Sequence, residues 1–149
     1  MSTGLEQLYQ QIILDHARAR HGGTLQDPAP GRKTGESHQL NPTCGDEITL
    51  RAELSGDTVT GLSWDGQGCA ISMASASVLT DLAREIPRAE LLSLVDNFRE
   101  VMRSRGKIQA DEEILGDAAA LSGVSRYSAR VKCAMLAWVA LEEALLAAN

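Results

Sequence analysis

Several features common in nucleic-acid-binding and membrane proteins are scarce in this sequence of 149 residues. Aromatic residues make up only 3%, too few to provide stacking platforms for bases. Acidic residues outnumber basic ones by 20 to 14, and the net charge of −6 argues against a nucleic-acid surface. No apolar run approaches the length of a membrane span, and the first apolar segment, LYQQIIL, is broken by polar residues. We therefore expect neither a nucleic acid nor a membrane as a partner.

Cysteine is also scarce: the chain has Cys44, Cys69 and Cys133, and its first residues show no secretory signal pattern. An odd number of thiols argues against a disulfide framework and favours a reducing compartment. We therefore expect a cytoplasmic protein whose thiols are either small buried residues or ligands.

The strand pattern of the first half predicts a small antiparallel sheet. In EITLRAEL the apolar residues alternate with polar ones, which places one face of the strand in a core. SGD then turns the chain, TVTGLSW runs back, and ESHQL is a candidate strand before them. Since helical patterns surround this region, we expect one α+β domain over residues 1–149, with about three strands packed against several helices.

Apolar residues at helical intervals predict several helices. In the first, Leu5 and Leu8 belong to the apolar stripe, and Thr3 and Glu6 have the spacing of a capping box. Tyr127 belongs to the stripe of the last helix. Four helices are expected after the sheet. The first begins at Cys69 and the second runs from Pro87 to Gly106. A short third helix lies near residues 111–121, and the last covers residues 126–147.

Each cysteine, taken alone, has a structural and a functional interpretation. Cys44 and Asp46 lie in the turn-forming segment NPTCGD, where Asp46 is either a ligand or the closing residue of an Asx-turn. Cys69 follows WDGQG and opens a helix, where its thiol meets free amide groups or simply lines a tight packing site. Cys133 has Arg130 and Lys132 nearby, which favour a thiolate, but it also lies close to an apolar stripe.

Together these residues match the ligands of tetrahedral zinc, since three thiolates and one carboxylate supply four suitable donors. The spacings are long and contain no CxxC pair, so spacing alone does not decide between a metal site and core cysteines. One histidine in place of Asp46 is an alternative fourth ligand, although surface histidines are the more frequent outcome. No Ser-His-Asp order, Walker loop or GxGxxG motif is present. The histidines are His16, His21 and His38.

The segments NPTCGD, DGQGCAISMASAS and SARVKCAMLAW resemble the three cysteine motifs of the IscU/SufU (NifU N-terminal-like) superfamily of iron–sulfur cluster assembly proteins. The resemblance extends from the first helix to the last and implies the family's α+β fold. IscU scaffolds have a histidine immediately before the third cysteine, whereas this chain has Lys132. The stretch between Cys69 and Cys133 is also longer, and both features are similar to the SufU branch.

The SufU resemblance implies a zinc-dependent sulfurtransferase that accepts persulfide sulfur from a SufS-like cysteine desulfurase. It implies that Cys44, Asp46, Cys69 and Cys133 bind Zn²⁺ and that Cys44 is the catalytic sulfur acceptor. Arg130 matches a basic position of the motif and is a candidate partner-interface residue. A downstream iron–sulfur scaffold complex is a further candidate partner. Because Cys44 lies in a loop flanked by Gly and Pro, we expect it to be the ligand that leaves most easily.

Two other functions use the same residues. The thiols could hold a transient iron–sulfur cluster, which would make the chain an assembly scaffold, although the missing histidine before Cys133 disfavours it. Alternatively, zinc supports only the fold.

Overall fold

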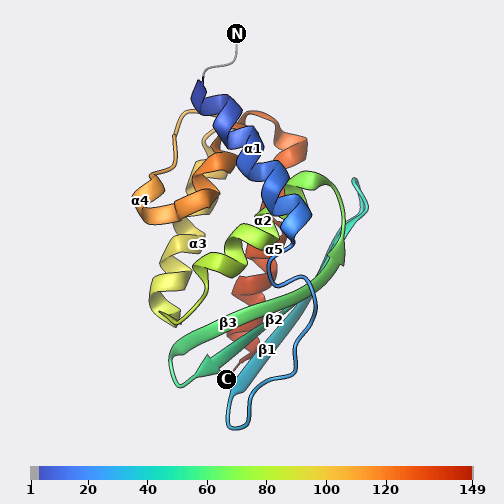
Figure 1. The fold of residues 1–149 in the computed structure, drawn as a ribbon, viewed down its shortest axis with the longest axis vertical. Helices are drawn as coiled ribbons and strands as arrows, with labels where there is room; N and C mark the ends of the chain where they lie inside the picture. The colour runs from blue at the N-terminus through green and yellow to red at the C-terminus, as the bar shows by residue number, and fades with distance from the viewer. Residues whose placement is uncertain (1–3, 149) are drawn as a thin grey trace.

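The structure is a computed structural model that describes residues 4–148. An antiparallel sheet with the strand order β1-β2-β3-β4 forms one end of it (Figure 1). Three of its strands are those the sequence predicts. The fourth was not expected, because a strand of two residues is too short to show alternation. The strands are β1 Lys33–Asn41, β2 Asp46–Ser55, β3 Thr58–Gln67 and β4 Ile86–Pro87.

Helices make up the rest of the structure, and the expected α+β class is confirmed. The short helix expected near residues 111–121 is instead one α-helical turn followed by a 3-10 helix, η1. Tyr127 was wrongly included in the last helix, because it precedes that helix and is 59% exposed. The capping residue Thr3 lies outside the described residues. The helices are α1 Gly4–Ala19, α2 Ala70–Leu82, α3 Arg88–Arg103, α4 Glu112–Leu115, η1 Gly116–Arg126 and α5 Ser128–Ala147.

The buried face of the sheet follows the predicted alternation along β2. Ile48, Leu50, Ala52 and Leu54 are all buried, and Asp46 begins the same series at the start of the strand. Helix α5 covers this face, passing behind β1 and β2 in Figure 1. The approach is close at Gly35 of β1, where an added Cβ would lie 1.7 Å from the carbonyl oxygen of Ala144.

Helix α2 packs between α1 and α5, and its many small residues permit this. Ser75 is fully buried in α2 and accepts a hydrogen bond of 2.8 Å from Nε1 of Trp138. Its own hydroxyl donates to the carbonyl oxygen of Ala134, at 2.6 Å. Trp138 also stacks on Phe98 of α3, with the ring centroids 4.0 Å apart. These contacts fix α5, and with it Cys133, relative to α2.

Helix α1 is less buried than its apolar stripe suggests. Leu5 and Leu8 are 50% and 56% exposed, because the helix packs on α2 and η1 mainly through its second half. His16 is the buried residue of this helix. Nowhere in the part of the chain that the structure describes is a helix both long and apolar enough to span a membrane.

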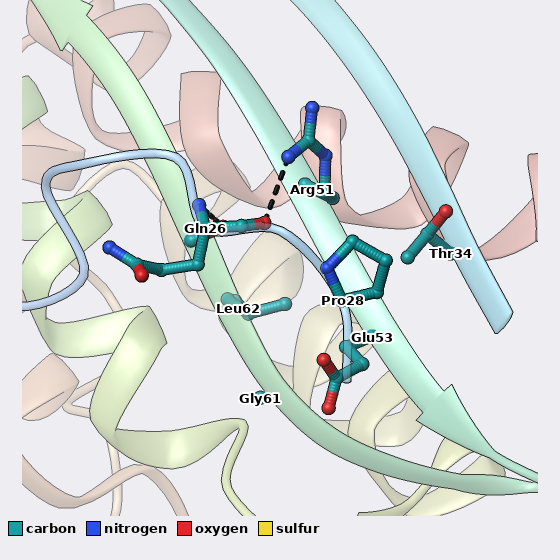
Figure 2. A pocket seen from close by; sticks show the side chains of 8 residues that line it. Gln26, Pro28, Thr34, Arg51, Glu53, Gly61 and Leu62 are labelled. Carbon is teal, nitrogen blue, oxygen red and sulfur yellow. Dashed lines mark hydrogen bonds between the residues drawn. The ribbon is translucent and has the colours of Figure 1, made fainter. Parts of the chain in front are cut away.

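The loop of residues 20–32 leads from α1 to β1 across the outer face of the sheet. It encloses a cavity of ≈ 120 Å³, shown in Figure 2, in which Nη1 of Arg51 donates to the carbonyl oxygen of Gln26 at 2.8 Å. Glu53 and Thr34 line the same cavity on the strand side. Since its lining contains no cysteine, this cavity is separate from the predicted site.

Candidate metal centre

Cys44 lies in the short turn that connects β1 to β2, and it is exposed. Asn41 organises this turn: its carbonyl oxygen accepts from the amide of Gly45 at 2.8 Å, and its Oδ1 accepts from the amide of Thr43 at 3.3 Å. Gly45 has a φ of 75°, in the left-handed region that favours glycine. The turn therefore has fixed ends and presents its thiol to solvent.

Asp46 is completely buried, because it is the first residue of β2 and points to the same side as the core residues of that strand. Its Oδ1 accepts a hydrogen bond of 2.9 Å from the amide of Cys69. Gly68 makes this approach possible, since a Cβ there would lie 2.4 Å from Oδ1 of Asp46 and 2.5 Å from Oγ of Ser72. The carboxylate thus links the start of β2 to the start of α2.

Cys69 is the N-cap residue of α2. Its sulfur accepts from the amide of Ser72 at 3.5 Å and lies 3.6 Å from the Ser72 hydroxyl. The same sulfur is 4.0 Å from Oδ2 of Asp46. Cys69 is exposed, so its interpretation as a buried packing residue is wrong.

Cys133 lies in the second turn of α5 and is buried, with 3% of its surface exposed. Its Sγ is 3.7 Å from Sγ of Cys44, and Nδ2 of Asn41 approaches it to 4.0 Å. Burial raises the pKa of the Cys133 thiol far above its ordinary value, and the neighbouring side chains of Asp46, Cys44 and Cys69 raise it further. Without a nearby positive charge, this thiol stays protonated.

The predicted site residues therefore come together from three distant segments. One ligand atom from each of Cys44, Asp46 and Cys133 lies within 4.8 Å of the other two. Cys69 lies outside that group, but its sulfur is 4.0 Å from the same carboxylate. A fully buried carboxylate needs hydrogen bonds or an opposite charge, and a divalent cation among these donors would supply the charge. Three sulfurs and one oxygen fit Zn²⁺, although their role as ligands stays a prediction.

None of the three histidines belongs to the cysteine-containing group found among residues 4–148. His38 pairs with Glu47 at 3.2 Å. His16 is 7% exposed, so the expectation of a surface position is wrong for it. It lies between Ser77 and Asp117 as in a hydrolase triad, but Ser77 is fully buried and out of reach of a substrate.

Two exposed basic residues of α5 lie close to Cys133 in the sequence. Arg130 is exposed in the first turn of α5, three residues before Cys133 and hence on the same side of the helix. Lys132 lines a groove of ≈ 350 Å³ beside the Cys44 turn, together with Leu40 and Met135. Contact of Arg130 with a partner stays a prediction.

Three residues of the centre were missed by sequence reasoning: Asn41, Gly68 and Ser72. Asn41 carried a signal, because an Asn just before a turn readily accepts bonds from the following amides. Ser72 follows an N-cap by three residues, a position that often contacts the cap. The need for Gly68 depends on the position of Asp46, which only the folded chain reveals.

Residues 8–145 match the family described as NifU-like N terminal domain. The chain belongs to this family. It is 41% identical over 143 residues to the "Zinc-dependent sulfurtransferase SufU" of Bacillus subtilis (strain 168), covering 95% of this chain and 92% of that protein. It is 38% identical over 143 residues to the "Iron-sulfur cluster assembly scaffold protein IscU" of Streptococcus pyogenes serotype M1, and the match covers 95% of this chain and 84% of that protein.

The fold is also similar to solved members of the family. A crystal structure from Fervidobacterium islandicum AW-1, of a protein proposed as an iron–sulfur cluster assembly scaffold for the SUF system, superposes with a TM-score of 0.74. The two chains are 32% identical, and the match covers 93% of this chain and 97% of the other. The predicted family membership is thus confirmed.

Proposed function

We propose that this chain is a zinc-dependent sulfurtransferase that accepts persulfide sulfur from a SufS-like cysteine desulfurase for iron–sulfur cluster assembly. The observation that carries the proposal is the contrast between an exposed Cys44 and a buried Cys133 whose sulfurs are 3.7 Å apart. One thiol of the centre is accessible to another protein while its neighbour is held in the core. The 41% identity to SufU of Bacillus subtilis supports the same function.

In this proposal Cys44, Asp46, Cys69 and Cys133 hold the zinc ion. Bound zinc would supply the positive charge that keeps the thiols deprotonated, against the burial that raises the pKa of Cys133. Asp46 sets the position of Cys69 through its backbone amide. Cys69 and Cys133 belong to helices, whereas Cys44 lies in a turn, so Cys44 is the residue that can move.

Sulfur transfer follows from this arrangement. The Cys44 thiolate attacks the terminal sulfur of the desulfurase persulfide and forms a new S–S bond with it. The original S–S bond breaks, and the desulfurase cysteine leaves as a thiolate. Cys44 then carries the persulfide, and no external oxidant or reductant is consumed.

The partner surface is expected around the Cys44 turn. Arg130 and Lys132 add positive charge there, although the protein as a whole is acidic, and Leu40 adds a side chain that is 54% exposed. We infer that the desulfurase docks on this side, with a downstream iron–sulfur scaffold complex as the later recipient. The proposal includes a cytoplasmic location and a single domain over residues 1–149.

The proposal is tested by adding the protein to a SufS-like desulfurase and measuring alanine release from cysteine. We expect wild-type protein to stimulate turnover and to acquire a persulfide on Cys44, detected by mass spectrometry. Cys44→Ala should abolish both effects while remaining folded, since the side chain is exposed. Ser93→Ala, at an exposed position of α3, is the control and should behave as wild type. Stimulation that survives Cys44→Ala would contradict the proposal.

The scaffold function remains the second candidate, because the chain is also 38% identical to an IscU of Streptococcus pyogenes. Metal content separates the two. A sulfurtransferase should be purified colourless with zinc at the cysteines, whereas a scaffold should accept iron and sulfide and develop the visible absorbance of a cluster.

A further inference from the structure

Two imidazoles and a carboxylate converge where the end of α1 meets α2, in a cluster that contains none of the cysteines. One ligand atom from each of His16, His21 and Asp81 lies within 4.8 Å of the other two. The His16 side chain is buried, whereas those of His21 and Asp81 are 42% and 39% exposed. We propose that these three residues form a second site for a divalent transition-metal ion, open to solvent on one side.

Asp117 and Ser77 fix the tautomer of His16. Nε2 of His16 is 2.9 Å from Oδ2 of Asp117, and a carboxylate can only accept a hydrogen bond, so this nitrogen carries the proton. Nδ1 is 2.8 Å from Oγ of Ser77. That hydroxyl also accepts from the backbone amide of His21 at 3.0 Å, and when Nε2 carries the single proton of a neutral ring the hydroxyl donates its own proton to Nδ1. Nδ1 therefore presents a lone pair.

This arrangement is the one found around metal-bound histidines. Such a residue binds the ion through one nitrogen and donates its other N–H to a carboxylate, which fixes the ring and strengthens the ligand. Asp117 provides that carboxylate here. A cation at Nδ1 of His16 would replace the Ser77 proton, and the buried Ser77 side chain, which also accepts from the His21 amide, would have to move aside.

The other two ligands already have a suitable separation. Nδ1 of His21 lies 2.9 Å and 3.0 Å from the two carboxylate oxygens of Asp81. A carboxylate only accepts, so this nitrogen carries a proton here, and a cation would bind it after that proton has moved to Nε2. Ligand atoms that bind zinc tetrahedrally at roughly 2.0–2.1 Å are about 3.3 Å apart. The His21 ring meets His16 edge-on with centroids 5.1 Å apart, and its partial exposure leaves it room to turn. Two imidazoles and one carboxylate suit Zn²⁺, Ni²⁺ or Cu²⁺, with water completing the coordination.

Arg84 is the nearby competitor, since its guanidinium pairs with Asp81 at 3.6 Å. Its side chain is 65% exposed, so a cation can displace it at small cost.

The test is a titration with Zn²⁺ alone, comparing wild-type protein with His21→Ala and Asp81→Asn. Wild type should bind one ion per chain more than either variant. His38→Ala removes an exposed histidine elsewhere and should match wild type. The difference between proteins is the readout, so the result holds whether or not the cysteines bind zinc. Equal numbers of ions in wild type and His21→Ala would overturn the proposal.

Asp117→Asn separates a metal site from a merely structural hydrogen bond. The Asp117 side chain is 58% exposed, so the variant should fold. Loss of the supporting carboxylate should weaken the additional zinc by roughly 10–100-fold without removing the ion at the cysteines. Zinc should also shift the imidazole ¹⁵N resonances of His16 and His21 in wild type. Unchanged affinity in Asp117→Asn, or histidine resonances that do not move, would refute the site.

Discussion

At the scale of single residues, the cysteine centre needs a position without a side chain as well as its donor atoms. The Asp46 carboxylate reaches the start of α2 only because Gly68 has no side chain. The Cys69 thiol caps that helix by accepting from the amide of Ser72, and the Asp46 oxygen accepts from the amide of Cys69 itself. The residues that shape the centre are thus as necessary as those that would bind zinc.

Gly68→Ala should therefore weaken zinc binding at the cysteines although it removes no ligand. The new methyl group would lie 2.4 Å from Oδ1 of Asp46, so the carboxylate has to move. Competition with a chromophoric chelator should report a lower zinc affinity. Gly61→Ala is the control, because its added Cβ meets nothing within 4 Å. Equal affinities in the two variants would show that the position of Asp46 does not matter for the metal.

The sequence predicted the donors of this centre better than their surroundings. Cys44, Asp46, Cys69 and Cys133 could be chosen because thiols and carboxylates in turn and helix-start positions have known chemistry. The roles of Gly68 and Asn41 follow from contacts across the fold, which local patterns do not encode. The burial of His16 was missed for the same reason, since its partners lie 61 and 101 residues away.

At the scale of elements, α2 organises the interior. Its serines and alanines leave space for α1 on one side and for Trp138 of α5 on the other. The Ser75 hydroxyl joins two helices, because it accepts from the Trp138 indole and donates to a backbone carbonyl of α5. The helix that begins at Cys69 is thereby fixed to the helix that carries Cys133.

Ser75→Ala should destabilise the fold by about 1–3 kcal/mol, the usual cost of leaving a buried donor without a partner, here Nε1 of Trp138. Urea unfolding followed by tryptophan fluorescence measures this change. Ser93→Ala, at an exposed position of α3, should stay within about 0.5 kcal/mol of wild type. If both variants unfolded at the same urea concentration, the hydrogen bond would not contribute to stability.

Periodicity predicted the long elements and failed for the short ones. The alternation along β2 predicted the correct buried face, because it repeats over several residues. Strand β4 and the 3-10 helix η1 depend on the elements around them and leave no such repeat. In α1 the apolar stripe is present, but Leu5 and Leu8 remain about half exposed.

At the scale of the whole molecule, the apolar core and the metal centre are separable. The core runs from the inner face of the sheet through α5 to α3 and consists of packed side chains. The cysteines lie where β2, α2 and α5 begin, at one margin of this core. The fold should therefore persist without metal, though with lower stability.

Removal of metal with a chelator should lower the unfolding temperature but leave a cooperative transition. Zinc that binds only the native state contributes about 2.7 kcal/mol when its free concentration is 100 times the dissociation constant. Scanning calorimetry before and after chelation, and again after zinc is restored, measures the shift. If the protein without metal showed no unfolding transition, the fold would depend on zinc, and the proposal of a sulfurtransferase with a releasable zinc ligand would be contradicted.

If Cys44 carries the sulfur, as we propose, the turn that bears it also restricts how that sulfur is passed on. It is short, Asn41 accepts hydrogen bonds from the amides of Thr43 and Gly45 within it, and the neighbouring Cys133 is only 3% exposed. A persulfide on Cys44 would be accessible from the exposed side of the turn alone, so the sulfur would be accepted and released on the same side. Donor and recipient would then have to visit in turn, and an excess of desulfurase should slow delivery onward.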